Sequence, residues 1–449
     1  MNSSRIPWKA ATALLLAVGA AQATNPLITD QFTADPTARV FEGRVYVYPS
    51  HDIPEPPGYK GRPKWFVMED YHVFSTDNFT DWKDHGVILS RNDVPWADKN
   101  AYAMWAPDAV VKDGKYYFYF PAMAAKENGG GFRIGVAIAD HPYGPFKPLE
   151  APIEGVRGID PGVLIDKDGS AYLYWSGMDK LWAAKLKPNM TEIEGEPKTF
   201  DYLPKKGLQE GPFAFERDGT YYLTYPHVAN KIERLEYATS KSPLGPFEWK
   251  GVILDESATG CWTVHHSLVD YQGQWYLFYH DRDLSPSFDK HRSIRADKLF
   301  FEPDGTIRKV IPTLRGVGVV KANNEIQIDR YSATSPEGVA VAFLDETNPY
   351  AGWKTTFSTP QSWVRFNEVD FGNGRQRSIE IRAKAAGKSA LEIRLDAPEG
   401  PVVGRVKVSG ASEWKSVTGR AKRVPPGVHD LYVTRSDGEP VDVDWVRFR

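Results

Sequence analysis

Ionisable side chains recur at nearly the same place before five similar turns of this 449-residue chain. Each lies six to nine residues before the glycine of its turn; they are Asp35, Asp108, Asp160, Glu210 and the neighbours His265 and His266. A single acidic residue before a strand usually forms a turn or protects a sheet edge. Four carboxylates in register need another reason, because like charges that crowd together raise each other's free energy. The pattern therefore indicates a catalytic site or a metal site.

Three carboxyl groups that meet in one place can perform acid–base chemistry. Hydrolysis of a glycosidic bond needs one carboxyl group that stays protonated near neutral pH and a second that stays ionised to activate water. A third carboxylate beside the acid raises the pKa of that acid by repulsion between like charges. The recurring positions supply enough carboxyl groups for all three roles.

A repeated hairpin has to bring these residues together. In each copy, an acidic or polar residue and a glycine lie between two alternating strands; the glycines are Gly43, Gly114, Gly169, Gly219 and Gly273. Such pairs favour tight hairpin turns, in which the backbone takes positive φ. Further strands follow most copies, as in 78–89, 141–149 and 242–254. Units of about 50 residues with four strands are typical of β-propeller blades.

Five copies predict an all-β chain with a five-bladed β-propeller over residues 24–320. A pair of stacked β-sandwiches is the alternative. We expect residues 307–314 to close the ring, and the Pro-rich stretch 53–63 to be an insertion beside the pocket. Residues 321–449 change to short alternating strands with frequent turns, which predicts a separate β-sandwich of jelly-roll type.

The bulk composition excludes one class of partner. The net charge is −3, so the chain has no basic excess that would attract nucleic acid. Aromatic residues make up 13% of the chain, which suits a β-rich core and also suits stacking on sugar rings. Cys261 is the only cysteine, so no intrachain disulfide is expected, and a small buried side chain is its simplest role.

The N-terminus has the pattern of a signal peptide. Arg5 and Lys9 precede the apolar run 10–21, and Ala21-Gln22-Ala23 offers a cleavage site. Later apolar runs are too short to span a membrane. We therefore expect residues 1–23 to be removed and the mature protein to be secreted or periplasmic, with no membrane partner.

Five segments resemble family 43 of the glycoside hydrolases; they are 34–52, 105–120, 158–177, 210–225 and 265–280. They follow the repeats in order and cover about residues 25–320. The resemblance implies a five-bladed propeller enzyme that acts with inversion on polymers containing arabinose and xylose, and that needs no cofactor for its chemistry.

The same resemblance assigns roles to individual residues. Asp35 corresponds to the general base, Asp160 to the residue that tunes the acid and orients the sugar, and Glu210 to the general acid. Asp108 has no assigned role and is expected to be structural.

Four further residues correspond to binding positions of the family. Trp105 corresponds to a residue of the sugar pocket, with a buried blade-core tryptophan as the alternative. Arg292 corresponds to an arginine that reaches the terminal sugar, with a surface arginine as the alternative, and His51 is a further pocket candidate. His265 corresponds to a histidine that faces a central structural ion, often calcium; a neutral imidazole that satisfies buried acids is the alternative.

The last 125 residues, 325–449, resemble a carbohydrate-binding module of family 6. The resemblance rests on segments 362–372, 427–433 and 441–449. Tyr350, Trp353 and Trp414 are the candidates for stacking on sugar. Asp442 stands where such modules often have asparagine, so a purely structural sandwich is the alternative.

The resemblance favours an exo-acting α-L-arabinofuranosidase that releases terminal arabinofuranose from plant arabinoxylan, because segments 48–52 and 70–78 resemble such members. A β-xylosidase, an endo-arabinanase and a galactosidase are the alternatives within the family. A glycan-binding propeller without catalysis is the alternative from another class, although a binding protein has no need of three catalytic carboxylates.

Overall fold

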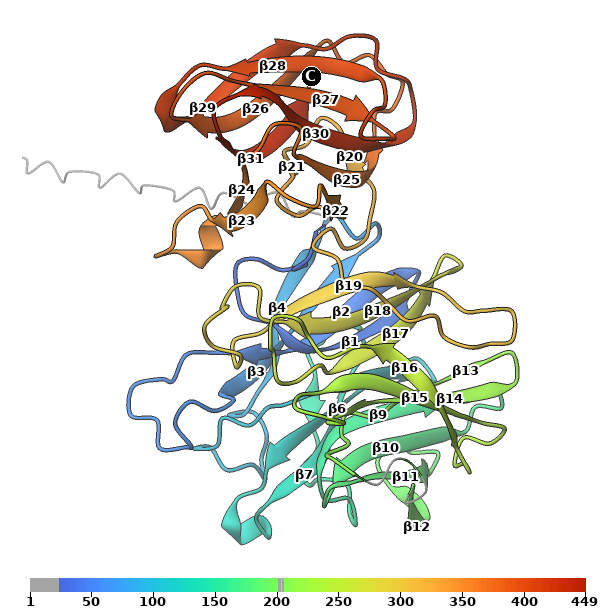
Figure 1. Ribbon diagram of the computed structural model, residues 1–449. Coiled ribbons are helices and arrows are strands. Elements are labelled where there is room, and N and C mark those ends of the chain that lie inside the picture. Colours follow the sequence, from blue (N-terminus) through green and yellow to red (C-terminus); the bar gives the residue numbers. More distant parts are fainter. Residues whose placement is uncertain (1–23, 201–202, 204–205) are drawn as a thin grey trace, which may run out of the picture.

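The computed structural model describes residues 24–200, 203 and 206–449. The predicted signal peptide lies outside the described residues. The described chain forms a propeller of β-sheets and a β-sandwich beside it (Figure 1). Helix in this part of the chain is limited to two short 3-10 turns, Lys126–Asn128 and Pro349–Ala351. None of its helices has the length and apolar character needed to cross a membrane.

Five antiparallel sheets make up the propeller. The first contains β1 (Ala34–Phe41), β2 (Arg44–Asp52), β3 (Met68–Thr76) and β4 (Lys83–Ser90). The second contains β5 (Asp108–Lys112), β6 (Lys115–Met123), β7 (Phe132–Ala139) and β8 (Lys147–Pro148). The third contains β9 (Ile159–Ile165), β10 (Ala171–Gly177), β11 (Lys180–Leu186) and β12 (Ile193–Thr199). The fourth contains β13 (Phe213–Arg217), β14 (Thr220–His227), β15 (Arg234–Ser240) and β16 (Glu248–Leu254). The fifth contains β17 (His266–Tyr271), β18 (Gln274–Asp281) and β19 (Ser293–Leu299).

The predicted hairpins join the first two strands of every sheet. The turn residues before Gly43, Gly114, Gly219 and Gly273 have positive φ, as do all five turn glycines, which is the conformation expected of such short turns. The first strand of each sheet contacts the first strand of the next, and β17 returns to contact β1. The five sheets thus form a closed ring, and the starts of β1, β5, β9, β13 and β17 meet around its axis.

The ring is not closed by residues 307–314, so this prediction is wrong. Val310 in that segment donates a backbone hydrogen bond to the Ile253 carbonyl at 2.8 Å, which places it on the fourth sheet. Instead, segment 24–33 runs along β19, with a 2.9 Å bond from the Leu27 N–H to the Ile294 carbonyl. This N-terminal segment has no alternating pattern, so its pairing depends on the edge of β19 that the three-stranded fifth sheet leaves open.

Aromatic side chains fill much of the space between neighbouring sheets. Tyr48 and Tyr71 of the first sheet and Phe118 of the second are fully buried in one cluster. Much of the aromatic content therefore belongs to the core, in line with the preference of such side chains for pleated sheets.

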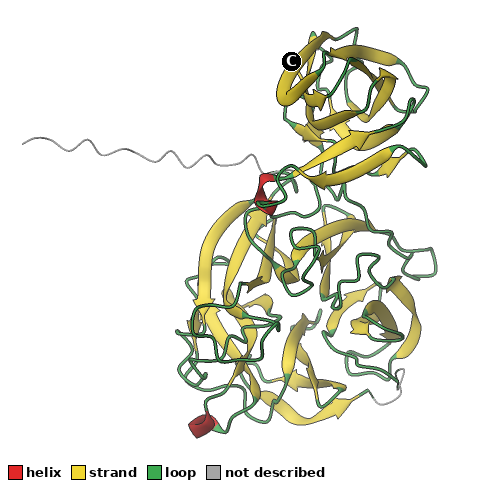
Figure 2. Ribbon diagram, turned by 60° about the vertical axis from the view of Figure 1, so that its left-hand side comes forward, coloured by secondary structure: helices red, strands yellow, loops and turns green. Residues whose placement is uncertain are grey.

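The second domain packs two sheets of six strands face to face (Figure 2). One contains β20 (Val320–Lys321), β22 (Ala333–Thr334), β25 (Trp363–Asp370), β27 (Ser389–Leu395), β28 (Val402–Val408) and β30 (Val428–Gly438). The other contains β21 (Ile326–Gln327), β23 (Val339–Phe343), β24 (Trp353–Phe357), β26 (Ser378–Ala385), β29 (Ala411–Arg420) and β31 (Val441–Phe448). Aliphatic and phenylalanine side chains fill the space between the two sheets.

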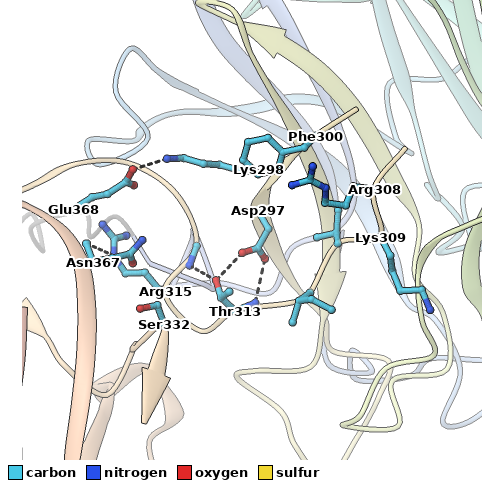
Figure 3. Close-up of a pocket in the computed structure, with 13 residues that line it drawn as sticks. Asp297, Lys298, Phe300, Arg308, Lys309, Thr313, Arg315, Ser332, Asn367 and Glu368 are labelled. Carbon is cyan, nitrogen blue, oxygen red and sulfur yellow. Dashed lines mark hydrogen bonds and ion pairs between the residues drawn. The ribbon is translucent and has the colours of Figure 1, made fainter. Parts of the chain in front are cut away.

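Polar contacts join the two domains beside a cavity of about 320 Å³ (Figure 3). Lys298 of the propeller pairs with Glu368 of the sandwich. The buried Arg315 donates to the Asn367 carbonyl at 3.1 Å, and its guanidinium group lies 4.2 Å from the ring centroid of Phe366.

An apolar cluster forms a second contact between the domains. Phe32 and Leu284 of the propeller form one buried cluster with Trp353 of the sandwich. Arg330 lies over the Trp353 ring at 4.0 Å. Trp353 is only 8% exposed, so it does not offer a free face for stacking on sugar. The prediction for Trp353 is therefore wrong, because the domain contact covers its ring.

Candidate active site

One pocket of about 210 Å³ opens where the five first strands converge. The first and third sheets contribute strand residues to it, and the segments that lead into strands of the other three sheets supply further side chains. Six of the predicted residues line this pocket: Asp35, Trp105, Asp160, Glu210, His265 and Arg292. Residues from positions 35 to 292 of the chain therefore meet in one enclosed space.

Strained backbone surrounds the pocket. Asp35 and Asp160 have φ of 47° and 56°, in the left-handed region that L-residues with side chains rarely adopt, and each precedes a proline. Gly211 takes the same conformation, with φ of 56°, also before a proline. The fourth copy thus has glycine at the strained position and its carboxylate, Glu210, one residue earlier. Strain of this kind persists where the surrounding structure holds it, often at functional sites.

Asp35 is held in its ionised form. Burial alone would raise the pKa of its carboxyl group. The Arg292 guanidinium group at 2.7 Å, together with His280, His265 and the hydroxyl of Ser50, offsets burial and holds that pKa below its usual value. Ser50 donates to Oδ2 at 2.7 Å, and the backbone N–H of Asp35 donates to Nδ1 of His280 at 3.0 Å. A carboxylate that stays ionised can accept a proton from water.

Arg292 connects two buried carboxylates. It is 2% exposed, which excludes the surface alternative. Its Nε donates to Asp52 at 2.9 Å while Nη1 reaches Asp35 at 2.7 Å. Two anions therefore share one cation in a site that is closed to solvent.

Replacing Arg292 with alanine is expected to destabilise the protein by about 3–5 kcal/mol, because two buried carboxylates lose their cation. Thermal unfolding measures this loss. Arg308→Ala is the matched control, because Arg308 pairs with Glu302 at the surface, and it should leave the melting temperature unchanged. Equal melting temperatures for Arg292→Ala and the wild type would contradict the buried network.

Burial and nearby charges favour the protonated forms of Glu210 and Asp160. Burial raises the pKa of Glu210 well above its usual value, and the charges of Glu233 and Asp35 raise it further. Burial and the charges of Glu210 and Asp35 also raise the pKa of Asp160. The Gly211 N–H donates to Oδ2 of Asp160 at 3.2 Å, which ties Asp160 to the backbone beside Glu210. The pocket therefore combines an ionised carboxylate with carboxylic acids, the pairing that acid–base hydrolysis needs.

Aromatic side chains form one wall of the pocket: Trp65, Phe66, Trp105 and Trp262. Trp105 packs against Phe132 with ring centroids 4.6 Å apart, so it belongs to the blade packing and to the pocket lining. Trp65 and Phe66 follow the Pro-rich stretch 53–63, which does not itself line the pocket. Two of the four wall residues thus lie just after the insertion.

His51 and Asp108 lie outside this pocket. His51 does not line it; its Nδ1 lies 2.8 Å from a carboxylate oxygen of Asp70. Asp108 pairs with Arg39 and accepts a 2.6 Å bond from the Val163 N–H, which links the first strands of three sheets.

His265 lines the pocket as a neutral imidazole, because burial lowers its pKa to about 4. Calcium needs six to eight oxygen ligands, whereas His265 offers a ring nitrogen. In the described part of the chain, the one group of three side chains whose ligand atoms lie within 4.8 Å of one another is His51, Asp70 and His72. No such group of His, Cys, Asp or Glu side chains includes His265 in the described residues.

Sequence patterns did not reveal several residues of this site. Asp52 holds Arg292, His280 accepts from the Asp35 backbone, and Glu233 lines the pocket beside Glu210. None stands at the repeated position before a hairpin, so the phase of the repeat could not find them. Segment 48–52 contained Asp52 without indicating its partner.

The model of the glycosyl hydrolases family 43 matches residues 23–307, which is more than half of the chain. The chain belongs to glycosyl hydrolase family 43. The model of the family 6 carbohydrate-binding module matches residues 334–449. The protein is thus a family 43 glycoside hydrolase with a C-terminal carbohydrate-binding module of family 6. Both predicted resemblances are confirmed.

Known relatives support the same assignment over different lengths. The enzyme is similar to Xylosidase/arabinosidase 43A of Humicola insolens, with 38% identity over 63% of this chain and 98% of the relative. It is similar to the arabinoxylan arabinofuranohydrolase of Bacillus subtilis (strain 168), with 29% identity over 91% of this chain and 88% of the relative. A compost-metagenome family 43 β-xylosidase/α-arabinofuranosidase, solved with xylotriose in calcium-free form, aligns with TM-score 0.58 and 36% identity over 65% of this chain and 98% of that chain. These similarities confirm the all-β fold and the glycoside hydrolase class.

Proposed function

We propose that this family 43 enzyme is an inverting, exo-acting α-L-arabinofuranosidase that acts on arabinoxylan. The observation that carries the proposal is one small pocket lined both by Asp35, whose pKa is lowered, and by Glu210, whose pKa is raised. A cavity of about 210 Å³ is smaller than the pockets that hold drug-sized ligands, so it suits one terminal sugar.

The proposed mechanism is a single displacement. Asp35 removes a proton from water, and the water oxygen attacks the anomeric carbon. The glycosidic bond breaks on the opposite face, and Glu210 transfers its proton to the leaving oxygen. Asp160 tunes the acid from its place at the Gly211 N–H, next to Glu210, and orients the sugar. Trp105 binds the sugar within the pocket, and Arg292, which also lines it, holds Asp35 ionised.

The substrate assignment rests on the relatives together with the pocket. The Bacillus subtilis relative is named an arabinoxylan arabinofuranohydrolase and aligns over both domains. A β-xylosidase is the second candidate, because the compost relative is named for both activities and was solved with xylotriose. Comparison of nitrophenyl arabinofuranoside with nitrophenyl xyloside hydrolysis separates the two activities.

Proton NMR during the first turnovers should show release of the anomer opposite to that of the substrate, because water attacks the face opposite the leaving group. Mutarotation then equilibrates the sugar, so early spectra decide the result. First appearance of the retained anomer would overturn the single-displacement mechanism.

We further propose that the enzyme is exported. The charged start, the apolar run 10–21 and the small residues at 21–23 support this proposal. No step of the mechanism uses a metal ion. Among the described residues, no group of three His, Cys, Asp or Glu side chains that could hold an ion includes His265.

A further inference from the structure

Glu233 is a buried carboxylate of the pocket that has no role in the mechanism above. It lies directly before β15 and is 1% exposed. Its Oε2 accepts a hydrogen bond from the Val264 N–H at 2.9 Å. Its Oε1 is buried and accepts no hydrogen bond from any N–H or O–H group of the described residues. A buried acceptor without a donor is costly and needs an explanation.

The charged groups that face Glu233 do not compensate it with a cation. The guanidinium N–H groups of Arg292 already donate hydrogen bonds to Asp35, Asp52 and Thr263. His265 is neutral, and the carboxylate of Asp35 adds negative charge rather than removes it. The carboxyl group of Glu210, however, lies within hydrogen-bonding reach of Glu233.

A proton on Glu210 resolves both problems at once. A protonated carboxyl group is a donor, and Oε1 of Glu233 is the acceptor that lacks one. The pair then carries one negative charge instead of two, which lowers the repulsion between neighbouring carboxylates. The two groups would titrate as a unit, as carboxylate pairs in contact do.

We propose that Glu233 is a positioning residue that shares one proton with Glu210 and keeps this acid protonated and aimed at the leaving oxygen. The inference rests on the proposed role of Glu210. During turnover the shared proton leaves Glu210 for the glycosidic oxygen, and the pair takes one proton back from solvent water before the next cycle. Burial raises the pKa of Glu233 to about 7, consistent with this shared protonation.

The test is the pH profile of kcat/KM for Glu233→Gln on arabinoxylan oligosaccharides, measured in chelator-treated buffer. Glutamine keeps the shape and the bond from Val264 but carries no negative charge. Without that charge the pKa of Glu210 falls, so the alkaline limb should move to lower pH by about one to three units. Glu236→Gln is the matched control, because Glu236 is equally buried near the start of β15 but pairs with His227 and Arg234. Its alkaline limb should stay in place.

An unmoved alkaline limb in a folded Glu233→Gln protein would overturn the proposal, even if the rate falls, because a purely structural role lowers the rate without moving the limb. If Glu233→Gln fails to fold, the pH profile of Glu233→Asp serves as the test. The shorter side chain places its carboxylate farther from Glu210, so the alkaline limb should again move to lower pH. Failure of the proposed function is recognised separately, because Glu210→Ala would then spare the hydrolysis of arabinoxylan.

Discussion

Asp35→Asn is expected to lower kcat/KM by about 10²–10⁴-fold on every substrate, because a general base is needed whatever the leaving group. Asparagine keeps the size of the side chain and can still accept the bond from Ser50. It loses the charge that faces Arg292, which remains paired with Asp52. The protein should therefore fold, and the loss should lie in the chemistry.

Steady-state kinetics with an aryl arabinofuranoside and with arabinoxylan measure this loss. Asp108→Asn is the matched control, because Asp108 is buried at the start of an equivalent strand but pairs with Arg39 outside the pocket. That variant should lose stability and keep its rate per folded molecule. Activity of Asp35→Asn within tenfold of the wild type would contradict the assignment of the base.

Glu210→Ala should distinguish substrates by their leaving groups. Arabinoxylan has a poor leaving group that needs a proton, so its hydrolysis should fall by about 10²–10⁴-fold. A dinitrophenyl arabinofuranoside has an activated leaving group that departs without a proton, so its loss should be far smaller. The alkaline limb of the pH profile should also disappear, because the group that titrates there is gone.

Parallel kinetics on the two substrates test this prediction. Asp35→Asn serves as the internal comparison, since it should slow both substrates alike. Equal losses of Glu210→Ala on arabinoxylan and on the activated substrate would show that Glu210 does not supply the proton.

Local sequence determined the blades and the position of the central carboxylates. Short turns and alternating strands are interactions between near neighbours, so the hairpin at Gly114 or Gly219 can be recognised from a few residues. A repeat also imposes equivalence in space. Asp35, Asp160 and Glu210 share a phase before their hairpins, and the same phase places them around one axis.

The tertiary structure decided the partners of these residues. Arg292 is buried because it joins Asp35 to Asp52, which is 240 positions away from it along the chain. Glu233 and the aromatic wall lie on connections that follow no repeat. Ring closure by segment 24–33 depends on the open edge of β19, more than 250 positions away along the chain.

The burial of Trp353 at the domain contact also depends on the tertiary structure. Trp353 has the residue type of a sugar platform, yet Phe32, Leu284 and Arg330 cover it. Periodicity and turn chemistry operate over a few residues and can therefore be read along the chain. Charge pairing and burial depend on groups that only the folded chain brings within a few ångströms, and here those groups determine which carboxyl carries a proton and which does not.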